Sequence, residues 1–482
     1  MSPAPLLLAA PAGVPFPFEA EISYAAPADG SRRLRLTGPT PGGERVSRSY
    51  RLEDSGQPAY LDLFAAVADD FGARMPVSRQ AHEPAPAGTP LRPLLTSALS
   101  PEILYGYGDP AVLRVTEGED RAWWLAVTSN DAPNAFPLLR SSDCERWTHE
   151  GFVFPEGRTP GWTLTGASQA DFWAPEMHRV GDEFWVCFTA REKDRTLAIG
   201  MAKALRPEGP YSAGEAPLVR GGVIDSHILL DRDATPWLFW KRDDNGVWPR
   251  LLCGLLHRQA DLIATLFPAP EDQRTASLAA TLEPFMRTVE PMEQFALLQP
   301  LIEAATHDFP NFGERLLRLG SDPALAGEIE AIRSALKTRV YAQRLAPDAM
   351  GLVGEPVLVL ENDQPWEAHL IEGVWVTEHG GRYYLLYAGN DFSTPHYGIG
   401  AAVADHPLGP YVKMDAPLLR SSLQWSGPGH PSVAIGPDGS HRMFLHAFAP
   451  GVAGYKAFRA LLSTPVAWEE NRVTLPGSDA DT

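Results

Sequence analysis

The sequence has little cysteine and no long apolar run. Its 482 residues include three cysteines, Cys144, Cys187 and Cys253, which are widely separated and odd in number. They form neither the even set of a disulfide-stapled fold nor the close pairs of a zinc site, and they indicate a reducing compartment. No run of apolar residues approaches the eighteen or so that a membrane-spanning helix requires, so we expect a soluble protein.

Basic residues are also in deficit. Lys and Arg number 41 against 60 Asp and Glu, which gives a formal net charge of −19 at pH 7. Nucleic acids and anionic membrane surfaces bind clustered Lys and Arg, so we expect neither as a partner, and a neutral or cationic small molecule fits this balance better. The N-terminus, "MSPAPLLLAAPAGVPF", lacks the basic segment of a secretory signal, which favours a cytoplasmic location.

The chain divides into segments that differ in residue pattern. Residues 1–95 contain a predicted hairpin, "FEAEISYAAPADGSRRLRLTG", and a predicted helix, "AYLDLFAAVADDFGARM", and end in the Pro-rich "EPAPAGTPLRP", which is typical of a linker. From about residue 96 short apolar strands alternate with Gly/Pro turns. Over 250–338 the apolar period becomes helical, and prolines separate several short helices. We therefore expect a small N-terminal α+β extension, a β-rich main domain over 96–482, and a helical insertion within it.

The β-rich part repeats itself. "IGMAKALRPEGPY" at 199–211 matches "IGAAVADHPLGPY" at 399–411, and "APLVR" and "APLLR" continue the register. Five stretches each combine an apolar strand, a tight polar turn and an aromatic-rich strand, and they begin near residues 108, 173, 224, 371 and 429. Apolar residues occupy both faces of the second strands, as in sheets buried between neighbours. The pattern predicts an all-β main domain in the form of a five-bladed β-propeller.

The intervals between these openings locate the insertion. Three of the four measure about 50 to 65 residues, and the interval that follows residue 224 measures about 147. The excess coincides with the helical stretch, so we place the insertion in the third blade. Its apolar faces pack on the propeller rim, or form a lid or a dimer interface. The oligomeric state stays open.

The innermost strands begin with residues that can do chemistry. In a propeller these starts converge on one mouth of the central channel, and here they are Asp109, Trp173, Asp225, Glu372 and His430. Three crowded carboxylates raise one another's pKa, which is characteristic of functional sites. Each alone also has an ordinary structural role, because an aspartate between glycine and proline is common in turns and Glu372 can simply begin a β-hairpin.

The openings resemble those of glycoside hydrolase family 43. The motifs that carry the resemblance, over roughly 105–250 and 339–465, are "GDPAV", "WAPE", "IDSHILLDRD", "IEGVWV", "IGAAVADHPLGPY" and "GPGHPSV". The resemblance implies a five-bladed enzyme that acts on arabinose- and xylose-containing glycans. It implies that Asp109 is the general base that activates water, that Glu372 is the general acid, and that Asp225 orients the acid and keeps its pKa high.

Such a trio suits an inverting glycosidase, whose acid and base stand about 6.5 to 9.5 Å apart with water between them. The acid must stay protonated near neutral pH, and a neighbouring aspartate supplies part of the upward pKa shift. Trp173 and Trp375 are candidates to stack on a sugar ring, although tryptophans also build cores. The resemblance places His430 at the channel axis, where it helps to hold an ion, often calcium, through water. As a lone histidine it has an equally ordinary hydrogen-bonded role.

Two departures from the family pattern bear on the substrate. The chain has Asp225-Ser226-His227 where the family commonly has Asp-Pro-Ser, and the helical insertion adjoins this blade. We predict an inverting, exo-acting glycoside hydrolase that releases L-arabinofuranose or D-xylose from short plant-derived oligosaccharides and requires no cofactor. The alternatives are a fructan hydrolase, a glycoside phosphorylase with an anion pocket of Arg or Lys, and a non-catalytic carbohydrate-binding propeller.

Overall fold

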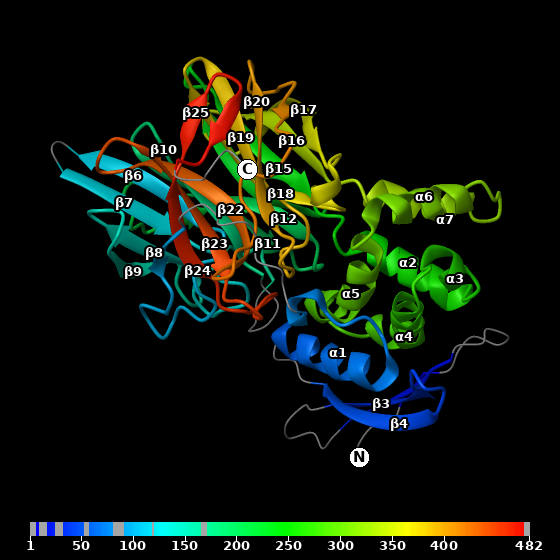
Figure 1. The fold of residues 1–482 in the computed structure, drawn as a ribbon. Helices are drawn as coiled ribbons and strands as arrows, with labels where there is room; N and C mark the ends of the chain where they lie inside the picture. Colours follow the sequence, from blue (N-terminus) through cyan, green and yellow to red (C-terminus); the bar gives the residue numbers. More distant parts are fainter. Residues whose placement is uncertain are drawn as a thin grey trace. The chain divides into compact units, whose positions relative to one another are not determined.

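The computed structural model describes residues 6–8, 17–24, 32–52, 57–80, 91–117, 120–164 and 171–476 (Figure 1). The chain divides into two compact units. The smaller unit comprises residues 1–82, 244–337 and 453–457, and the larger unit comprises 83–243, 338–452 and 458–482. In the part of the chain described, none of the helices has both the length and the apolar character needed to span a bilayer.

Five four-stranded antiparallel sheets make up most of the larger unit, which confirms its predicted all-β character. Their strands are β6 (Ala111–Glu117), β7 (Asp120–Ala126), β8 (Ala135–Ser141), β9 (Trp147–Phe154); β10 (Trp173–Val180), β11 (Glu183–Arg191), β12 (Leu197–Ala204), β13 (Ser212–Ala213); β14 (Val223–Leu230), β15 (Pro236–Arg242), β16 (Arg339–Leu345), β17 (Leu352–Glu361); β18 (Ile371–His379), β19 (Arg382–Gly389), β20 (Gly398–Ala404), β21 (Val412–Lys413); and β22 (Ser426–Ile435), β23 (His441–Phe448), β24 (Ala460–Pro465), β5 (Arg92–Leu95). A hairpin of β25 (Ala467–Glu469) and β26 (Arg472–Thr474) follows. The first strands, β6, β10, β14, β18 and β22, contact one another in a closed cycle.

The second strands are buried on both faces, as the sequence predicts. In β11 every residue after Glu183 is buried. Phe184 and Val186 lie in a core shared with the first sheet, whereas Trp185 and Cys187 lie in a core shared with the third. Alternate side chains of one strand therefore hold the sheets on either side of it.

The two copies of the sequence repeat adopt the same local structure. Ile199 bridges to Val219, and Ile399 bridges to Leu419. The tyrosine that ends each copy donates its hydroxyl to a proline carbonyl four residues earlier, at 2.8 Å in the first copy and 3.0 Å in the second. The similar sequences therefore form the same turn in the second and fourth sheets.

A backbone kink recurs where each first strand begins. The angle φ is positive at Asp109 (53°), Ala174 (44°), Asp225 (56°), Gly373 (57°) and His430 (49°). In β10, β14, β18 and β22 the pairing with the second strand shifts register at this point. A bulge of this kind changes the direction in which a side chain points, and the left-handed backbone costs a non-glycine residue about 1 to 2 kcal/mol. The same kink therefore re-aims one side chain or peptide group in each sheet.

The smaller unit combines the N-terminal extension with the helical insertion. Its sheet contains β1 (Leu6–Leu8), β2 (Glu19–Tyr24), β3 (Arg32–Pro39) and β4 (Arg45–Leu52), and its helices are α1 (Gln57–Phe71), the 3-10 turn η1 (Val77–Arg79), α2 (Val247–Arg258), α3 (Leu262–Leu266), α4 (Pro270–Met286), α5 (Pro291–Thr306), α6 (Phe309–Leu319) and α7 (Ala326–Ala335). Along the chain, the helices α2 to α7 follow β15 and precede β16 of the third sheet, which is where the sequence predicts an insertion. In Figure 1 the blue sheet and α1 lie beside the green helices α4 and α5.

These two segments share one hydrophobic core, although more than 150 residues separate them. Phe18 and Phe71 of the extension lie in the same buried cluster as Trp248 of the insertion. The Arg74 guanidinium pairs with Asp272 on α4, with Nη2 and Oδ2 3.0 Å apart. The sequence pattern predicts the extension and the insertion as two separate additions. Local apolar periodicity does not reveal which surfaces pack together, so their shared core could not be predicted.

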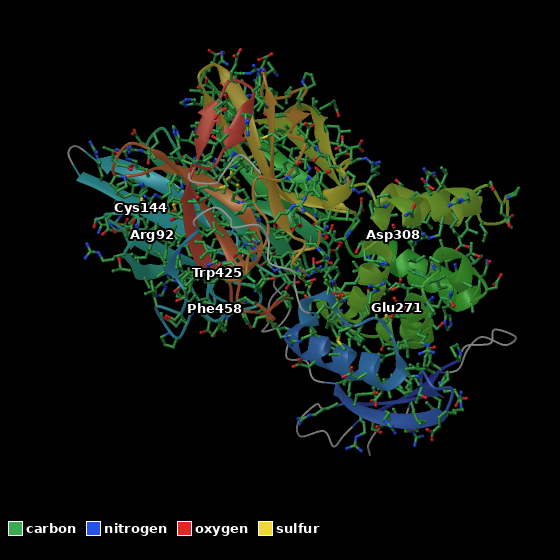
Figure 2. The ribbon with its side chains drawn as sticks, viewed as in Figure 1. Arg92, Cys144, Glu271, Asp308, Trp425 and Phe458 are labelled. Atoms are coloured by element: carbon green, nitrogen blue, oxygen red, sulfur yellow. The ribbon has the colours of Figure 1, made fainter. Side chains whose placement is uncertain are left out.

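The fifth sheet is completed by a strand from before the first sheet. In β5, Leu95 pairs with Leu461 and Arg92 with Ser463 of β24. Arg92 is labelled in Figure 2. The sequence pattern predicts that residues up to 95 belong to the extension and its Pro-rich linker, whereas the structure places Arg92–Leu95 in the β-rich unit. Pro93 is tolerated because β5 is an edge strand.

We predict that Leu95→Ala lowers the free energy of unfolding by about 2 to 4 kcal/mol, because it removes a buried side chain from the core that joins β5 to Phe444 and Leu461. Urea titration followed by tryptophan fluorescence measures the change. Leu99→Ala is the matched control, since this side chain is 43% exposed, and it should cost less than about 1 kcal/mol. Equal losses in the two variants would contradict a role for β5 in completing the sheet.

Candidate active site

The three predicted carboxylates come together at the kinks. Asp109 precedes β6, Asp225 lies in β14 and Glu372 in β18, and the exposed fractions are 9%, 7% and 8%. Burial, followed by the negative charges of Glu372, Asp109 and Asp225, raises the pKa of Tyr397 well above its usual value. The Gly373 N–H donates to Asp225 Oδ2 at 2.9 Å and so ties β18 to β14 beside Glu372. One tyrosine therefore lies within electrostatic reach of all three carboxylates.

Asp109 is held as an anion. Its Oδ1 accepts a hydrogen bond from Arg459 Nη1 at 2.8 Å, and its Oδ2 accepts one from the Thr128 hydroxyl. Burial on its own raises the pKa of this carboxyl, but the Arg459 guanidinium, followed by the His430 imidazole, outweighs it and holds the pKa well below its usual range. A general base must be ionised before it can accept a proton, and Asp109 meets that requirement.

His446 fixes the backbone of Asp109. The Asp109 N–H donates to Nδ1 of His446 at 3.0 Å, so this nitrogen carries no proton. Burial and the nearby Arg459 charge lower the pKa of His446 to about 4. The Tyr397 ring stacks on the imidazole with centroids 6.2 Å apart. His446 is therefore a neutral acceptor that stabilises the kink at Asp109.

Glu372 lies between a lysine and a tyrosine. Lys241 Nζ, fully buried near the end of β15, donates to Oε2 at 2.9 Å, and the Tyr397 hydroxyl donates to Oε1 at 2.8 Å. Burial pushes the pKa of Glu372 upward, but the Lys241 charge and these hydrogen bonds outweigh burial and lower the pKa. In this geometry Glu372 is an anion at neutral pH.

Asp225 is the carboxyl that retains a proton most readily. Burial raises its pKa to about 6, the charges of Glu372 and Asp109 act in the same direction, and those of His430 and Lys241 oppose them. The expectation that Asp225 keeps the pKa of Glu372 high is corrected here. Sequence reasoning considered only the carboxylates, whereas Lys241 supplies a buried positive charge that decides the pKa of Glu372.

The three predicted binding residues are placed differently from one another. Trp173 is partly exposed beside the kink of β10, with the Arg191 guanidinium 5.5 Å from its ring centroid. Trp375 is buried, and its ring lies 4.6 Å from that of His227, so it is a core residue rather than the predicted sugar platform. Nδ1 of His430 lies 3.4 Å from Asp109 Oδ1, which places His430 beside the predicted base.

A calcium ion beside His430 stays a prediction. Calcium takes six to eight oxygen ligands. The Asp109 carboxylate beside His430 already accepts hydrogen bonds from Arg459 and Thr128, so an ion there would take most of its ligands from water, as the prediction supposes.

The charged and aromatic residues that contact the carboxylates were not predicted from the sequence; they are Lys241, Tyr397, His446 and Arg459. Lys241 did leave a signal, because it follows the apolar run "PWLFW" in a strand predicted to be buried on both faces, where a charge requires a partner. The other three lie away from the strand openings, and no local pattern distinguishes them.

Glycine makes room for Tyr397. A Cβ at Gly429 would stand 1.8 Å from Cε1 of Tyr397, closer than any side chain permits. The backbone angle φ of Gly429 lies outside the left-handed region, so space alone requires glycine there. The hydrogen bond from the Tyr397 hydroxyl to Glu372 thus depends on the absence of a Cβ at Gly429 in β22.

The chain matches known proteins over much of its length after residue 100. The family described as "Glycosyl hydrolases family 43" matches residues 100–263 and 327–473. "Xylosidase/arabinosidase 43A" of Humicola insolens is 22% identical over 255 residues, which cover 53% of this chain and 60% of that protein. "Extracellular endo-alpha-(1->5)-L-arabinanase 1" of Bacillus subtilis is 22% identical over 143 residues, which cover 27% of this chain and 43% of that protein. The chain therefore spans about three fifths of the first of these relatives and less than half of the second.

Solved structures also resemble it. A thermostable family-43 glycoside hydrolase has a TM-score of 0.53 and 24% sequence identity, over 78% of this chain and 95% of that one. An endo-1,4-beta-xylanase from Bacteroides thetaiotaomicron has a TM-score of 0.50 and 20% identity over the same shares. At sequence identities this low, the similarity to solved structures establishes the fold and not the activity.

We predict that Gly429→Ala displaces Tyr397 and lowers the free energy of unfolding by about 1 to 3 kcal/mol, the usual cost of overpacking. Chemical denaturation of the full chain measures it. Gly161→Ala is the control, because nothing lies within 4 Å of a Cβ at that position. If Gly429→Ala is as stable as Gly161→Ala, the close contact with Tyr397 is not a constraint.

Proposed function

Because the chain belongs to glycoside hydrolase family 43, we propose that it is an inverting, exo-acting glycosidase that releases L-arabinofuranose or D-xylose from short plant-derived oligosaccharides. The observation that carries the proposal is the set of three buried carboxylates at the kinked strand starts, each in a different electrostatic environment. The names of the two curated relatives support the choice of sugars.

The five sheets are the blades of a five-bladed propeller in this proposal. The closed cycle of contacts between the first strands and the pairing of β5 with β24 support it. So does the resemblance to a solved family-43 enzyme. In such an arrangement the strand starts line one mouth of the axis, which brings Asp109, Asp225 and Glu372 around a single sugar unit.

Asp109 acts as the general base. Its low pKa keeps it ionised, and its fixed bonds to Arg459 and Thr128 orient the carboxylate. A water molecule between this carboxylate and the anomeric carbon loses its proton to Asp109 as it attacks. An inverting displacement needs this geometry, with the acid on the opposite side of the sugar ring.

Glu372 acts as the general acid once its contact with Lys241 is weakened. The departing glycosidic oxygen must accept a proton, so Glu372 must be protonated when the bond breaks. Lys241 opposes that state at 2.9 Å. Asp225, whose pKa of about 6 lets it carry a proton in mildly acidic solution, is next to the strand that holds Glu372. A second assignment, with Asp225 itself as the acid, is favoured by that pKa.

A hydrolase fits the site better than a phosphorylase does. A phosphorylase needs a cation available to bind phosphate. The two buried cations that contact the carboxylates, Arg459 and Lys241, are engaged with Asp109 and Glu372. Inorganic phosphate should therefore not replace water as the acceptor of the sugar.

The acid is identified by leaving-group dependence. We expect Glu372→Gln to lose hydrolysis of arabino- or xylo-oligosaccharides by about 10² to 10⁴-fold, the usual contribution of general acid catalysis, and to retain much of its cleavage of aryl glycosides, whose leaving groups need little protonation. Phenol release and sugar release are measured for the wild type, Glu372→Gln and Asp225→Asn. Glu378→Gln, on the same strand, is the control.

The same split in Asp225→Asn instead would assign the acid to Asp225. A folded wild type that cleaves neither type of substrate would contradict the enzymatic proposal and favour a carbohydrate-binding propeller. Release of sugar phosphate only when inorganic phosphate is present would favour the phosphorylase. Proton NMR of the first product formed tests inversion.

Lys241→Met should shift the pH profile. The Lys241 charge lowers the pKa of Glu372, so its removal raises that pKa, and the alkaline limb of kcat/KM on oligosaccharides should move upward by about 1 to 3 pH units. Lys203→Met, which removes a partly exposed ammonium from β12, is the control and should leave the limb in place. An unmoved alkaline limb in folded Lys241→Met would mean that Glu372 is not the titrating acid.

A further inference from the structure

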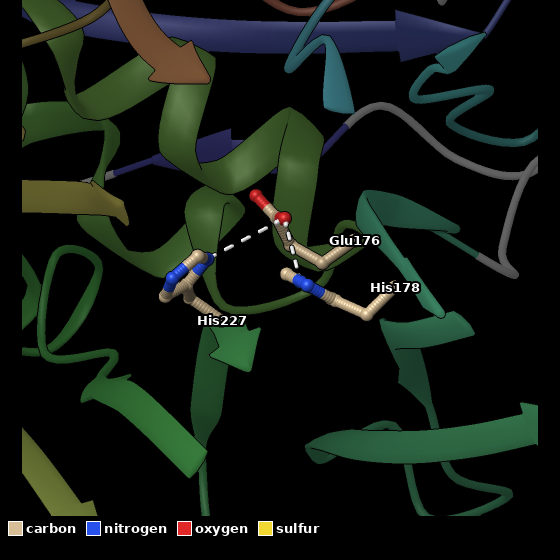
Figure 3. A group of neighbouring side chains, drawn as sticks. All are labelled: Glu176, His178 and His227. Carbon is tan, nitrogen blue, oxygen red and sulfur yellow. Dashed lines mark ion pairs between the residues drawn. The ribbon is translucent and has the colours of Figure 1, made fainter. Parts of the chain in front are cut away.

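A second group of ionisable side chains lies one step further along the first strands. Glu176 and His178 project from β10, and His227 projects from β14 (Figure 3). Glu176 Oε2 lies 3.3 Å from Nε2 of His178 and 3.5 Å from Nδ1 of His227. All three atoms lie within 4.8 Å of one another. Among the described residues, this is the group of His, Cys, Asp and Glu side chains whose ligand atoms converge in this way.

The strand geometry explains why these residues meet. Regular pairing resumes after the kink at Glu176 in β10, which pairs with Cys187, and at His227 in β14, which pairs with Phe239. These two residues are thus the first regularly paired positions beyond the kinks of two neighbouring strands. His178 follows Glu176 by two positions and shares its face of β10.

The three facing atoms have no hydrogen-bond partner among the described residues. The side chains of Glu176 and His227 are 3% and 1% exposed, and that of His178 is 13% exposed. A buried carboxylate oxygen without a partner costs several kcal/mol unless a cation compensates it. A positive charge among the three atoms would therefore stabilise the cluster.

The proton on His227 is fixed by its other nitrogen. Nε2 lies 3.0 Å from the Val376 carbonyl, which can only accept, so Nε2 carries the proton. In the neutral imidazole, Nδ1 then presents a lone pair to Glu176 Oε2. Two lone pairs that face each other in a buried site repel, and a cation between them removes the repulsion.

We propose that Glu176, His178 and His227 bind a divalent transition-metal ion of the zinc class. Two imidazoles and one carboxylate are a ligand set that zinc uses with a water molecule as the fourth ligand. At metal–ligand distances near 2.0 to 2.1 Å, tetrahedral ligand atoms stand about 3.3 to 3.4 Å apart. The separations of 3.3 and 3.5 Å from Glu176 Oε2 match this spacing, and the two nitrogens need only a modest approach.

A protonated histidine explains the cluster less well. A charge-assisted hydrogen bond between imidazolium and carboxylate is about 2.7 to 2.9 Å long. Both separations exceed that range, and neither pair meets hydrogen-bond geometry. Trp375 also covers both imidazoles, with ring centroids 5.9 Å from His178 and 4.6 Å from His227, and so shields the cluster from water.

The ion would join neighbouring first strands, one of which carries Asp225. It links β10 to β14, and the bond from His227 to Val376 continues the link to β18. The site has no residue in common with the trio of Asp109, Asp225 and Glu372, so it holds whether or not the proposed glycosidase activity is correct. Its role is to fix the spacing of three first strands.

Metal content and thermal stability test the proposal. The full chain is stripped with a chelator, dialysed against ZnCl₂, freed of excess zinc and assayed by atomic emission. We expect about one zinc per wild-type chain and a melting temperature raised by about 5 °C or more over the stripped protein. Glu176→Gln and His227→Gln should each lose both effects, and His178→Gln, at the most exposed ligand, provides the same test if the others do not fold.

Two controls make the result specific. His441→Gln changes a partly exposed histidine outside the cluster and should keep one zinc per chain. Glu372→Gln should also keep it, which separates the metal site from the catalytic trio. Cobalt(II) should give the visible absorption of a tetrahedral centre in the wild type but not in Glu176→Gln. A wild type that retains no stoichiometric zinc, or a folded ligand variant that retains as much as the wild type, overturns the proposal.

Discussion

The kink at the start of each first strand is the constraint on which the site depends. It places Asp109, Asp225 and His430 in left-handed backbone that costs each about 1 to 2 kcal/mol, and the surrounding sheets must supply that energy. At Gly373 the same conformation costs little, and a Cβ there would stand 2.9 Å from the His430 ring. Strain is thus retained at these three residues, whereas glycine relieves it where a peptide N–H is needed for Asp225.

Three carboxylates can share one buried site because each has a different charge environment. Arg459 compensates Asp109, and Lys241 compensates Glu372. Asp225 has only a peptide N–H as its described donor, so its pKa rises to about 6. Asp225 is therefore the first of the three carboxyl groups to take up a proton as the pH falls below neutral. The same inequality of environments is what assigns acid and base roles in a glycosidase.

The sequence predicts what depends on short-range pattern. Strand starts, second strands buried on both faces and the helical stretch are all encoded within windows of about 20 residues, and so Asp109, Asp225 and Glu372 could be identified before the structure. Lys241 and Arg459 could not be assigned to them, because each reaches its carboxylate from a different part of the fold. The shared core of the smaller unit and the pairing of β5 with β24 are long-range in the same sense. The prediction that Trp375 stacks on a sugar is wrong for a related reason. Its position in the strand does not distinguish a residue that stacks on a sugar from one that packs in the core.

The layers along the first strands explain both the failure at Trp375 and the second cluster. Two residues after the kink, the chain places Glu176 in β10, His227 in β14 and Trp375 in β18. Regular pairing resumes at these three residues after the register shift, and all three are buried, so they form a layer beyond the kinks rather than a lining at the mouth. The carboxylate and the imidazole in that layer are buried against the Trp375 ring. Their charge must therefore be balanced locally, and an ion held between β10 and β14 would balance it while fixing the distance between the strands that position the kinks.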